Sequence, residues 1–188
     1  MGHPKALLVY RGETFLHGIL EAAYAAGIER RVVVLGGHAD RIRKAMDLPD
    51  VQVVMTKDVA AGPIGSIRAG INAVLNHPVE GALIWPVDRP HVQVATIQAL
   101  AAAFLSEGHD IVVPEYQGRR GHPVIFARSV FAELLAAPDS LGARAVVRRD
   151  PNRVARVPVD DAAILEDLNT PEDYRDLVRR EDRHRAGG

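Results

Sequence analysis

A regular alternation between short β-branched runs and longer amphipathic stretches is the feature of this sequence that most limits its fold. The apolar runs predict strands that are buried on both faces, at residues 31–35, 51–55, 82–86 and 110–113. Helix-like stretches lie at residues 15–26, 39–47, 66–75 and 95–106. We therefore expect an α/β fold with three layers, in which helices cover both faces of a mostly parallel, doubly wound sheet.

The second half of the chain continues this pattern less regularly. Strands are expected at residues 122–126 and 153–157, and helices at residues 128–136, 142–149 and 171 to about 180. Residues 179–188 are charged and end in glycine, which is typical of a frayed tail. We predict one domain over residues 1–178 and a flexible tail over residues 179–188.

Several helix ends carry recognisable capping residues. Thr14 can cap the first helix, and Gly27 can end it in a left-handed conformation. Ser66 is expected to cap the third helix. Thr170 is expected to cap the last one, with Pro171 in its first turn.

The composition excludes several classes of function. A chain of 188 residues, 47% hydrophobic and 25% charged, is long enough for one buried core. Its formal net charge of −1 gives no electrostatic reason to expect a nucleic-acid partner. It has no cysteine, which excludes disulfides, thiolate metal sites and a cysteine nucleophile. We see no signal peptide and no apolar stretch of membrane-spanning length, so we expect a cytoplasmic protein without a membrane partner.

Asp88 is the first candidate for chemistry, because ligands of α/β folds bind beyond the carboxyl ends of the strands. It directly follows an apolar run and stands between Pro86 and Pro90, which stiffen the backbone on both sides. One interpretation is a carboxylate ligand for a divalent cation. The other is a cap for the helix that begins near Gln93, although Asp88 lies far upstream for a cap.

Two loops carry residues that suit anionic ligands. In the loop from Gly62 to Arg68, glycines followed by a helix start could bind an anion or a base edge, but the pattern alone favours a tight loop with a serine cap. The loop is neither a Walker motif nor a dinucleotide fingerprint. Arg119 and Arg120 could grip phosphates bidentately, or could form a charged surface turn. His122, before a proline, could be an acid–base group or a structural residue.

Two polar segments near the chain ends are also candidates. Lys5 follows Pro4, where a lysine is ordinarily solvated. Asp167 and Asn169 precede the cap of the last helix and have no helix-capping explanation of their own. The eight histidines show no metal-ligand spacing, and no Ser-His-Asp order appears.

Taken in order, these segments resemble a known family. They are Gly2-x-Pro4-Lys5, Gly65-Ser-Ile-Arg-Ala-Gly70, Pro86-Val-Asp-x-Pro90, Arg119-Arg-Gly-His-Pro123, Gly142-Ala-Arg144 and Asp167-x-x-Thr-Pro-Glu-Asp173. The sequence resembles the MobA-like NTP-transferase family over residues 2 to about 178, most closely its molybdenum-cofactor cytidylyltransferase branch. The molybdopterin-guanine dinucleotide synthases are further relatives in the same family. The resemblance implies the Rossmann-like nucleotidyltransferase fold.

The resemblance also implies an activity, a set of ligands and their residues. The activity is Mg²⁺-dependent transfer of CMP or GMP from CTP or GTP to molybdopterin-type cofactor or a similar phosphorylated small molecule, with release of pyrophosphate. Asp88 and Lys5 would be catalytic, Asp88 as a metal ligand and Lys5 as the charge that neutralises the phosphates. A molybdoenzyme or its chaperone would be a possible protein partner.

The remaining residues follow from the same resemblance. Gly65, Ser66 and Arg68, together with Lys5, would bind the nucleotide. Arg119, Arg120 and His122 would bind the acceptor. Asn169 stands where relatives generally have a second metal-binding aspartate, so it would be a metal ligand without charge.

The resemblance differs most at the front of the chain. Family members begin with a strand and an Ala-Ala-Gly-x-Ser-x-Arg-Met-Gly loop that wraps the phosphates. Met1 and Gly2 coincide with the last two residues of that loop, so the first strand and the phosphate loop are expected to be missing. This difference and Asn169 leave a second hypothesis open, a non-catalytic relative that binds a nucleotide, a cofactor or a molybdoenzyme-maturation partner. A dinucleotide-binding oxidoreductase is disfavoured, because no glycine-rich turn with a downstream acid follows the first expected strand.

Overall fold

The computed structural model describes residues 3–58 and 60–186 of the chain, so Gly2 lies outside the described residues. The α-helices are α1 (Phe15–Ala25), α2 (Ala39–Ala45), α3 (Pro63–Val74), α4 (Val94–Glu107), α5 (Phe131–Ala136), α6 (Ala143–Arg149) and α7 (Pro171–Ala186). The strands are β1 (Val9–Tyr10), β2 (Glu13–Thr14), β3 (Val32–Leu35), β4 (Gln52–Met55), β5 (Gly81–Ile84), β6 (Ile111–Tyr116), β7 (Arg119–Arg120), β8 (Val124–Ala127) and β9 (Val154–Pro158). Short 3₁₀ helices are η1 (Lys5–Leu7), η2 (Arg128–Val130), η3 (Pro151–Arg153) and η4 (Ala162–Leu165).

The strands form a mixed sheet arrangement, whereas the sequence pattern predicted a mostly parallel one. Parallel pairing joins β3 to β4 and β6 to β9, while β8 runs antiparallel to both β5 and β6. Strand β7 returns antiparallel to β6 through a tight hairpin. The ladder β3–β4 is not paired with the larger ladder β5–β8–β6 among the described residues. The reversal of β8 has a local cause, because the chain turns back through the β6–β7 hairpin before it enters β8.

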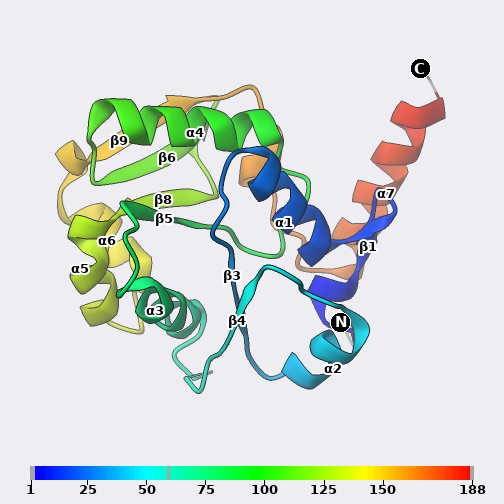
Figure 1. The fold of residues 1–188 in the computed structure, drawn as a ribbon. Coiled ribbons are helices and arrows are strands. Elements are labelled where there is room, and N and C mark those ends of the chain that lie inside the picture. Colours follow the sequence, from blue (N-terminus) through cyan, green and yellow to red (C-terminus); the bar gives the residue numbers. More distant parts are fainter. Residues whose placement is uncertain (1–2, 59, 187–188) are drawn as a thin grey trace.

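Helices cover both faces of the larger ladder, which confirms the α/β layered fold (Figure 1). Side chains alternate along each strand, so consecutive residues pack into different cores. Residues Ile111, Val113, Val124 and Phe126 join a core with α3, α5 and α6, whereas Val112 and Ile125 join one with Leu100 of α4. All six of these strand residues are at most 6% exposed. The strand–helix alternation in the sequence therefore corresponds to two apolar cores on opposite sides of one sheet.

The N-terminal part of the chain packs around β3. Val33 and Leu35 form a third core with Leu16 and Leu20 of α1 and with Ala6 of η1. Thr14 caps α1 as predicted, since its hydroxyl accepts a hydrogen bond from the His17 amide at 3.3 Å. Gly27, just beyond the helix, adopts the left-handed conformation at φ 87°.

Two helix boundaries differ from the sequence-based expectation. Helix α3 begins at Pro63 with Gly62 as its cap residue, so Ser66 lies inside the helix and is not its cap. Proline at the first helical position is favoured because it has no amide proton to leave unsatisfied. Helix α7 extends to Ala186 and therefore includes most of the segment expected to be a frayed tail.

Ion pairs made by two α7 residues account for this longer helix. Arg180 forms a bidentate pair with Glu166, at 2.9 and 2.8 Å, and Arg11 pairs with Glu181 at 2.9 Å. The start of α7 is as predicted: Asp173 donates its amide to the Thr170 hydroxyl, and the Asp173 carboxylate accepts from the Thr170 amide. Among the described residues, no helix combines the length and the apolar character needed to cross a membrane.

Candidate active site

Three of the predicted site residues meet although they are far apart in the sequence. The Lys5 ammonium group donates a hydrogen bond of 2.7 Å to Oδ1 of Asn169. It also lies 3.6 Å from Oδ2 of Asp88, with both side chains about one quarter exposed. The main-chain oxygen of Asp88 accepts from the amide of Leu168 at 3.1 Å, which fixes the two loops against each other. A lysine, a carboxylate and an amide oxygen therefore form one polar cluster beyond β5.

Asp88 is not a helix cap, which excludes the second interpretation of its position. Helix α4 begins at Val94 with Gln93 as its N-terminal cap residue, and Asp161 binds the start of this helix. The Asp161 carboxylate accepts from the Gln93 amide at 2.9 Å and from the Thr96 hydroxyl at 2.7 Å. By contrast, Oδ1 of Asp88 is buried and has no hydrogen-bond partner among the described residues. A buried carboxylate oxygen without a partner is costly unless a ligand satisfies it.

The oxygen atoms in this cluster suit a hard divalent cation but supply only part of its coordination. Carboxylate and amide oxygens are ligands that Mg²⁺ and Mn²⁺ accept, and Asp88 and Asn169 offer one of each. The described residues hold no group of three histidine, aspartate or glutamate side chains that could enclose a metal. A cation here would therefore complete its coordination with substrate phosphates and water, as Mg²⁺ commonly does.

Arg89 connects the Asp88 loop to the segment that carries Asn169. Its side chain is 8% exposed, pairs with Asp167 and donates to the main-chain oxygen of Ile164. The Trp85 indole donates to the Arg89 carbonyl at 3.0 Å. Asp167, which has no role as a helix cap, is explained by this pair. The role of Arg89 was not predicted from the sequence, since its partners lie more than 70 residues further along the chain.

His122 lies close to this cluster and is largely buried. Burial lowers the pKa of His122, and the positive charge of Arg89 lowers it further, against smaller opposing effects of Asp167 and Asp88. Its Nδ1 atom is buried and has no hydrogen-bond partner among the described residues. The imidazole is therefore neutral near pH 7 and has an unused hydrogen-bonding atom.

The adjacent arginines are placed differently from His122. Arg119 and Arg120 form β7 and are exposed. The turn before them has positive φ at Gln117 and Gly118, which fits a two-residue hairpin. No hydrogen bond or ion pair described in the structure joins either arginine to Asp88 or Lys5. Their proposed contact with the acceptor therefore remains a prediction.

The residues expected beside the nucleotide lie at the start of α3. A Cβ atom on Gly65 would collide with the backbone of Asp58, so this glycine allows the preceding loop to pass close over the helix. Ser66 is half-buried in the same turn. Arg68 already has partners: Asp139 at 2.8 Å, Asp58 at 3.4 Å and the carbonyl of Ala137 at 2.6 Å. The structure thus shows how Arg68 joins neighbouring loops, while nucleotide binding by this turn stays a prediction.

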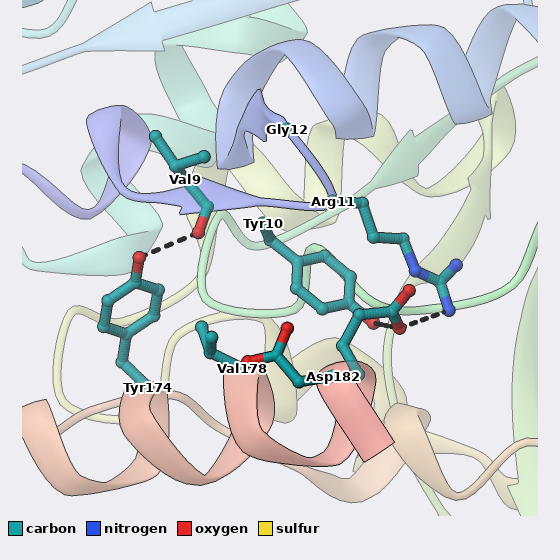
Figure 2. Close-up of a pocket in the computed structure, with 8 residues that line it drawn as sticks. Val9, Tyr10, Arg11, Gly12, Tyr174, Val178 and Asp182 are labelled. Atoms are coloured by element: carbon teal, nitrogen blue, oxygen red, sulfur yellow. Dashed lines mark hydrogen bonds and ion pairs between the residues drawn. The ribbon is translucent and has the colours of Figure 1, made fainter. Parts of the chain in front are cut away.

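The two described pockets do not contain the Lys5–Asp88–Asn169 cluster. One hollow of about 260 Å³ lies between the β1–β2 hairpin and α7, and Tyr10, Arg11 and Tyr174 help to line it (Figure 2). The other, of about 250 Å³, is lined by residues 166–168 and by polar residues of α7. The second hollow includes Asp167 and Leu168, which directly precede Asn169 in the chain.

Because His122 and His91 are buried, we predict that the free energy of unfolding falls as the pH decreases. Burial lowers the pKa of both His122 and His91, so each binds fewer protons when folded than when unfolded. Their stabilising effect is complete above the unfolded pKa of about 6.5 and is lost as pH falls from there through the folded value. The free energy of unfolding should therefore decrease between pH 7 and pH 5, by at most about 1.4 kcal/mol per pH unit for each histidine.

Urea unfolding at several pH values checks this prediction. His122→Asn should show a shallower pH dependence than the unmodified protein over the same interval. Carboxylates with a lowered pKa, such as Glu166, act in a more acidic window and do not confuse the comparison. An identical slope in both proteins would show that His122 does not titrate as its burial requires.

Comparisons with known proteins identify the relatives of this chain. The model of the MobA-like NTP transferase domain matches residues 1–155. The chain is 29% identical to nicotine blue oxidoreductase of Paenarthrobacter nicotinovorans, an alignment that covers 93% of this chain and 88% of that protein. It is 28% identical to a probable molybdenum cofactor guanylyltransferase of Opitutus terrae, with 96% of this chain and 89% of that protein covered.

Among solved structures, Rv0371c of Mycobacterium tuberculosis H37Rv in complex with manganese is 34% identical to this chain. The two superpose with a TM-score of 0.78, covering 95% of this chain and 93% of that one. The Rossmann-like nucleotidyltransferase architecture expected from the resemblance is confirmed by this likeness. With a family match over most of its length and this shared fold, the chain belongs to the MobA-like NTP transferase family and is a nucleotidyltransferase.

Proposed function

We propose that this nucleotidyltransferase moves CMP or GMP from CTP or GTP to molybdopterin-type cofactor or a similar phosphorylated small molecule, with Mg²⁺ or Mn²⁺ as the cation. The observation that carries the proposal is the meeting of Lys5, Asp88 and Asn169, where one buried Asp88 oxygen has no partner within the described part of the chain. Two similar proteins support it: one is a probable molybdenum cofactor guanylyltransferase, and the other, Rv0371c, was solved in complex with manganese.

The reaction requires positioning and charge neutralisation more than covalent catalysis. A phosphate oxygen of the acceptor forms a bond to the α-phosphorus of the NTP. The bond from that phosphorus to the bridging α–β oxygen breaks, and pyrophosphate leaves with the electron pair. Asp88 and Asn169 would hold the divalent cation, which supplies neutralising charge to the phosphates when bound.

Lys5 would contribute a second positive charge at the same place. Its ammonium group is a compact cation with three donors, which suits contact with phosphate oxygens. In the structure it contacts Asp88 and Asn169. We propose that phosphates of the NTP take over these hydrogen bonds to Lys5 and leave the Asp88 and Asn169 oxygens for the cation.

Pyrophosphate release tests the proposal directly. The protein is incubated with CTP or GTP, Mg²⁺ or Mn²⁺, and molybdopterin-type cofactor, and pyrophosphate is measured by a coupled assay. We expect release that needs both the cation and the acceptor, with a preference for one nucleotide. Nucleotide binding by calorimetry without release under any of these conditions would instead support the non-catalytic hypothesis.

A further inference from the structure

The three segments that carry the polar cluster rest on one small apolar core. This core consists of Phe15, Leu168 and Leu177, with Leu8, Tyr10, Val87 and Tyr174 packed against it. Val87 directly precedes Asp88, and Leu168 directly precedes Asn169. Leu8 lies three residues beyond Lys5, at the end of η1. The relative positions of Lys5, Asp88 and Asn169 therefore depend on how this core is held together.

Tyr174 in the first turns of α7 makes the most direct link between two of these segments. Its hydroxyl donates a hydrogen bond of 2.8 Å to the main-chain oxygen of Val9, and this contact is drawn in Figure 2. Its ring packs edge-on against Phe15, with 5.8 Å between the ring centroids. Its amide donates to the carbonyl of Thr170, the residue next to Asn169. Tyr174 thus joins the Lys5 segment to the Asn169 segment within a few residues of each side chain.

A second set of contacts braces the same two segments further along α7. Glu181 pairs with Arg11 at 2.9 Å and accepts a hydrogen bond from the Tyr10 hydroxyl at 3.2 Å. The hollow in Figure 2 separates these contacts from the Tyr174 contact. The β1–β2 hairpin is therefore attached to α7 at two points, and Tyr174 is the one that lies nearer to Lys5 and Asn169.

We infer that Tyr174 is a positioning residue for the proposed active site, and that its hydroxyl keeps Lys5 in contact with Asp88 and Asn169. The inference rests on the proposed function, because the role of Lys5 in the reaction is part of that proposal. The contacts of Tyr174 do not depend on it. Lys5 and Asn169 lie far apart in the sequence. The 2.7 Å contact between their side chains therefore lasts only while η1 and the start of α7 stay aligned. The hydrogen bond to Val9 fixes that alignment by one directional contact.

Lysine acylation provides a test that needs no turnover. The chain contains three lysines, Lys5, Lys44 and Lys57, and the last two are exposed. A trace of acetic acid N-hydroxysuccinimide ester is added to the protein, and the acylation rate of each lysine is measured by mass spectrometry. In Tyr174→Phe we expect the Lys5 rate to rise about threefold to tenfold, the range that corresponds to loss of one neutral hydrogen bond. The rates of Lys44 and Lys57 should not change.

Tyr24→Phe is the matched control, because Tyr24 is 57% exposed and lies on α1, away from this core. It should leave all three rates unchanged. A general rise at all three lysines in Tyr174→Phe would show loss of stability only, and an unchanged Lys5 rate would show that the hydroxyl does not position Lys5. Either result overturns the inference.

Kinetic measurements distinguish a failure of this inference from a failure of the proposed function. If the protein releases pyrophosphate, Tyr174→Phe should raise the KM for the nucleotide more than it lowers kcat, since Lys5 contacts the phosphates. A protein with no pyrophosphate release would contradict the proposed function while the acylation result for Lys5 stands by itself.

Discussion

Asp88→Asn is expected to lower metal-dependent nucleotidyl transfer by a factor of about 10³ or more while the fold stays intact. Asp88 is the one carboxylate in the polar cluster, since its neighbour Asn169 carries no charge. Asparagine keeps the shape of the side chain but removes the charge that would attract the cation. The variant loses only a partly exposed ion pair with Lys5, which contributes about 1 kcal/mol or less. Because Oδ1 of Asp88 is buried and has no partner among residues 3–58 and 60–186, the thermal midpoint should not fall.

Two variants serve as controls for this result. Asp160 is exposed in the turn after β9, and Asp160→Asn should leave both activity and Mn²⁺ binding unchanged. Asn169→Asp adds a second carboxylate and should increase the affinity for Mn²⁺. Calorimetric titration with Mn²⁺ and initial rates at saturating cation measure the two effects. Full activity of Asp88→Asn would contradict the proposed metal ligand and, with it, the central part of the site.

Gly121→Ala is expected to destabilise the protein by about 3 kcal/mol or more, through a backbone collision. A Cβ at this position would meet the carbonyl group of Ile164, with the carbonyl carbon and the Ile164 Cβ both at 2.7 Å. Neither backbone segment, the one at Gly121 or the one at Ile164, can easily move. The amide of Gly121 donates to Pro114, and the amide of His122 donates to the same Ile164 oxygen at 3.0 Å. The thermal midpoint should fall by about 6 to 12 °C.

Gly18→Ala is the matched substitution with the opposite expected sign. Gly18 lies inside α1, and a Cβ there would meet no atom within 4 Å. Alanine in a helix interior is favoured over glycine by about 1 kcal/mol, so the midpoint should rise slightly. Differential scanning calorimetry of both variants decides the matter. If Gly121→Ala melted at the same temperature as the unmodified protein, the close packing between β7 and η4 would be wrong.

The sequence pattern located the main elements well because their signals are local. The strands predicted at 31–35, 51–55 and 110–113 lie within two or three residues of β3, β4 and β6. The capping roles of Thr14 and Thr170 are confirmed by hydrogen bonds. Strand direction was predicted less well, because the antiparallel pairing of β8 follows from the β6–β7 hairpin, and the two residues of β7 are too few to form a strand pattern.

The parts of the site that the sequence missed depend on contacts over long distances in the chain. Asp161 binds the start of α4 from 68 residues away, and Arg89 holds a segment 75 residues beyond it. The β1–β2 hairpin was missed because its strands have two residues each and its turn places Arg11 at φ 56°, a conformation that arginine does not signal. Lys5, Asp88 and Asn169 were candidates from their positions in the sequence, and the family resemblance assigned their roles; in the structure Lys5 contacts both Asp88 and Asn169.

The separation of the β3–β4 ladder from the β5–β8–β6 ladder has a consequence for how the protein unfolds. Backbone hydrogen bonds across a sheet make neighbouring strands open together, whereas side-chain packing alone links them more weakly. Among the described residues these two ladders share cores but no strand pairing. The N-terminal ladder can therefore open as its own cooperative unit while the larger one persists. We therefore expect hydrogen exchange in β3 and β6 to report two different free energies of opening, and Lys5, whose neighbour Ala6 packs in the core of β3, to follow the N-terminal unit.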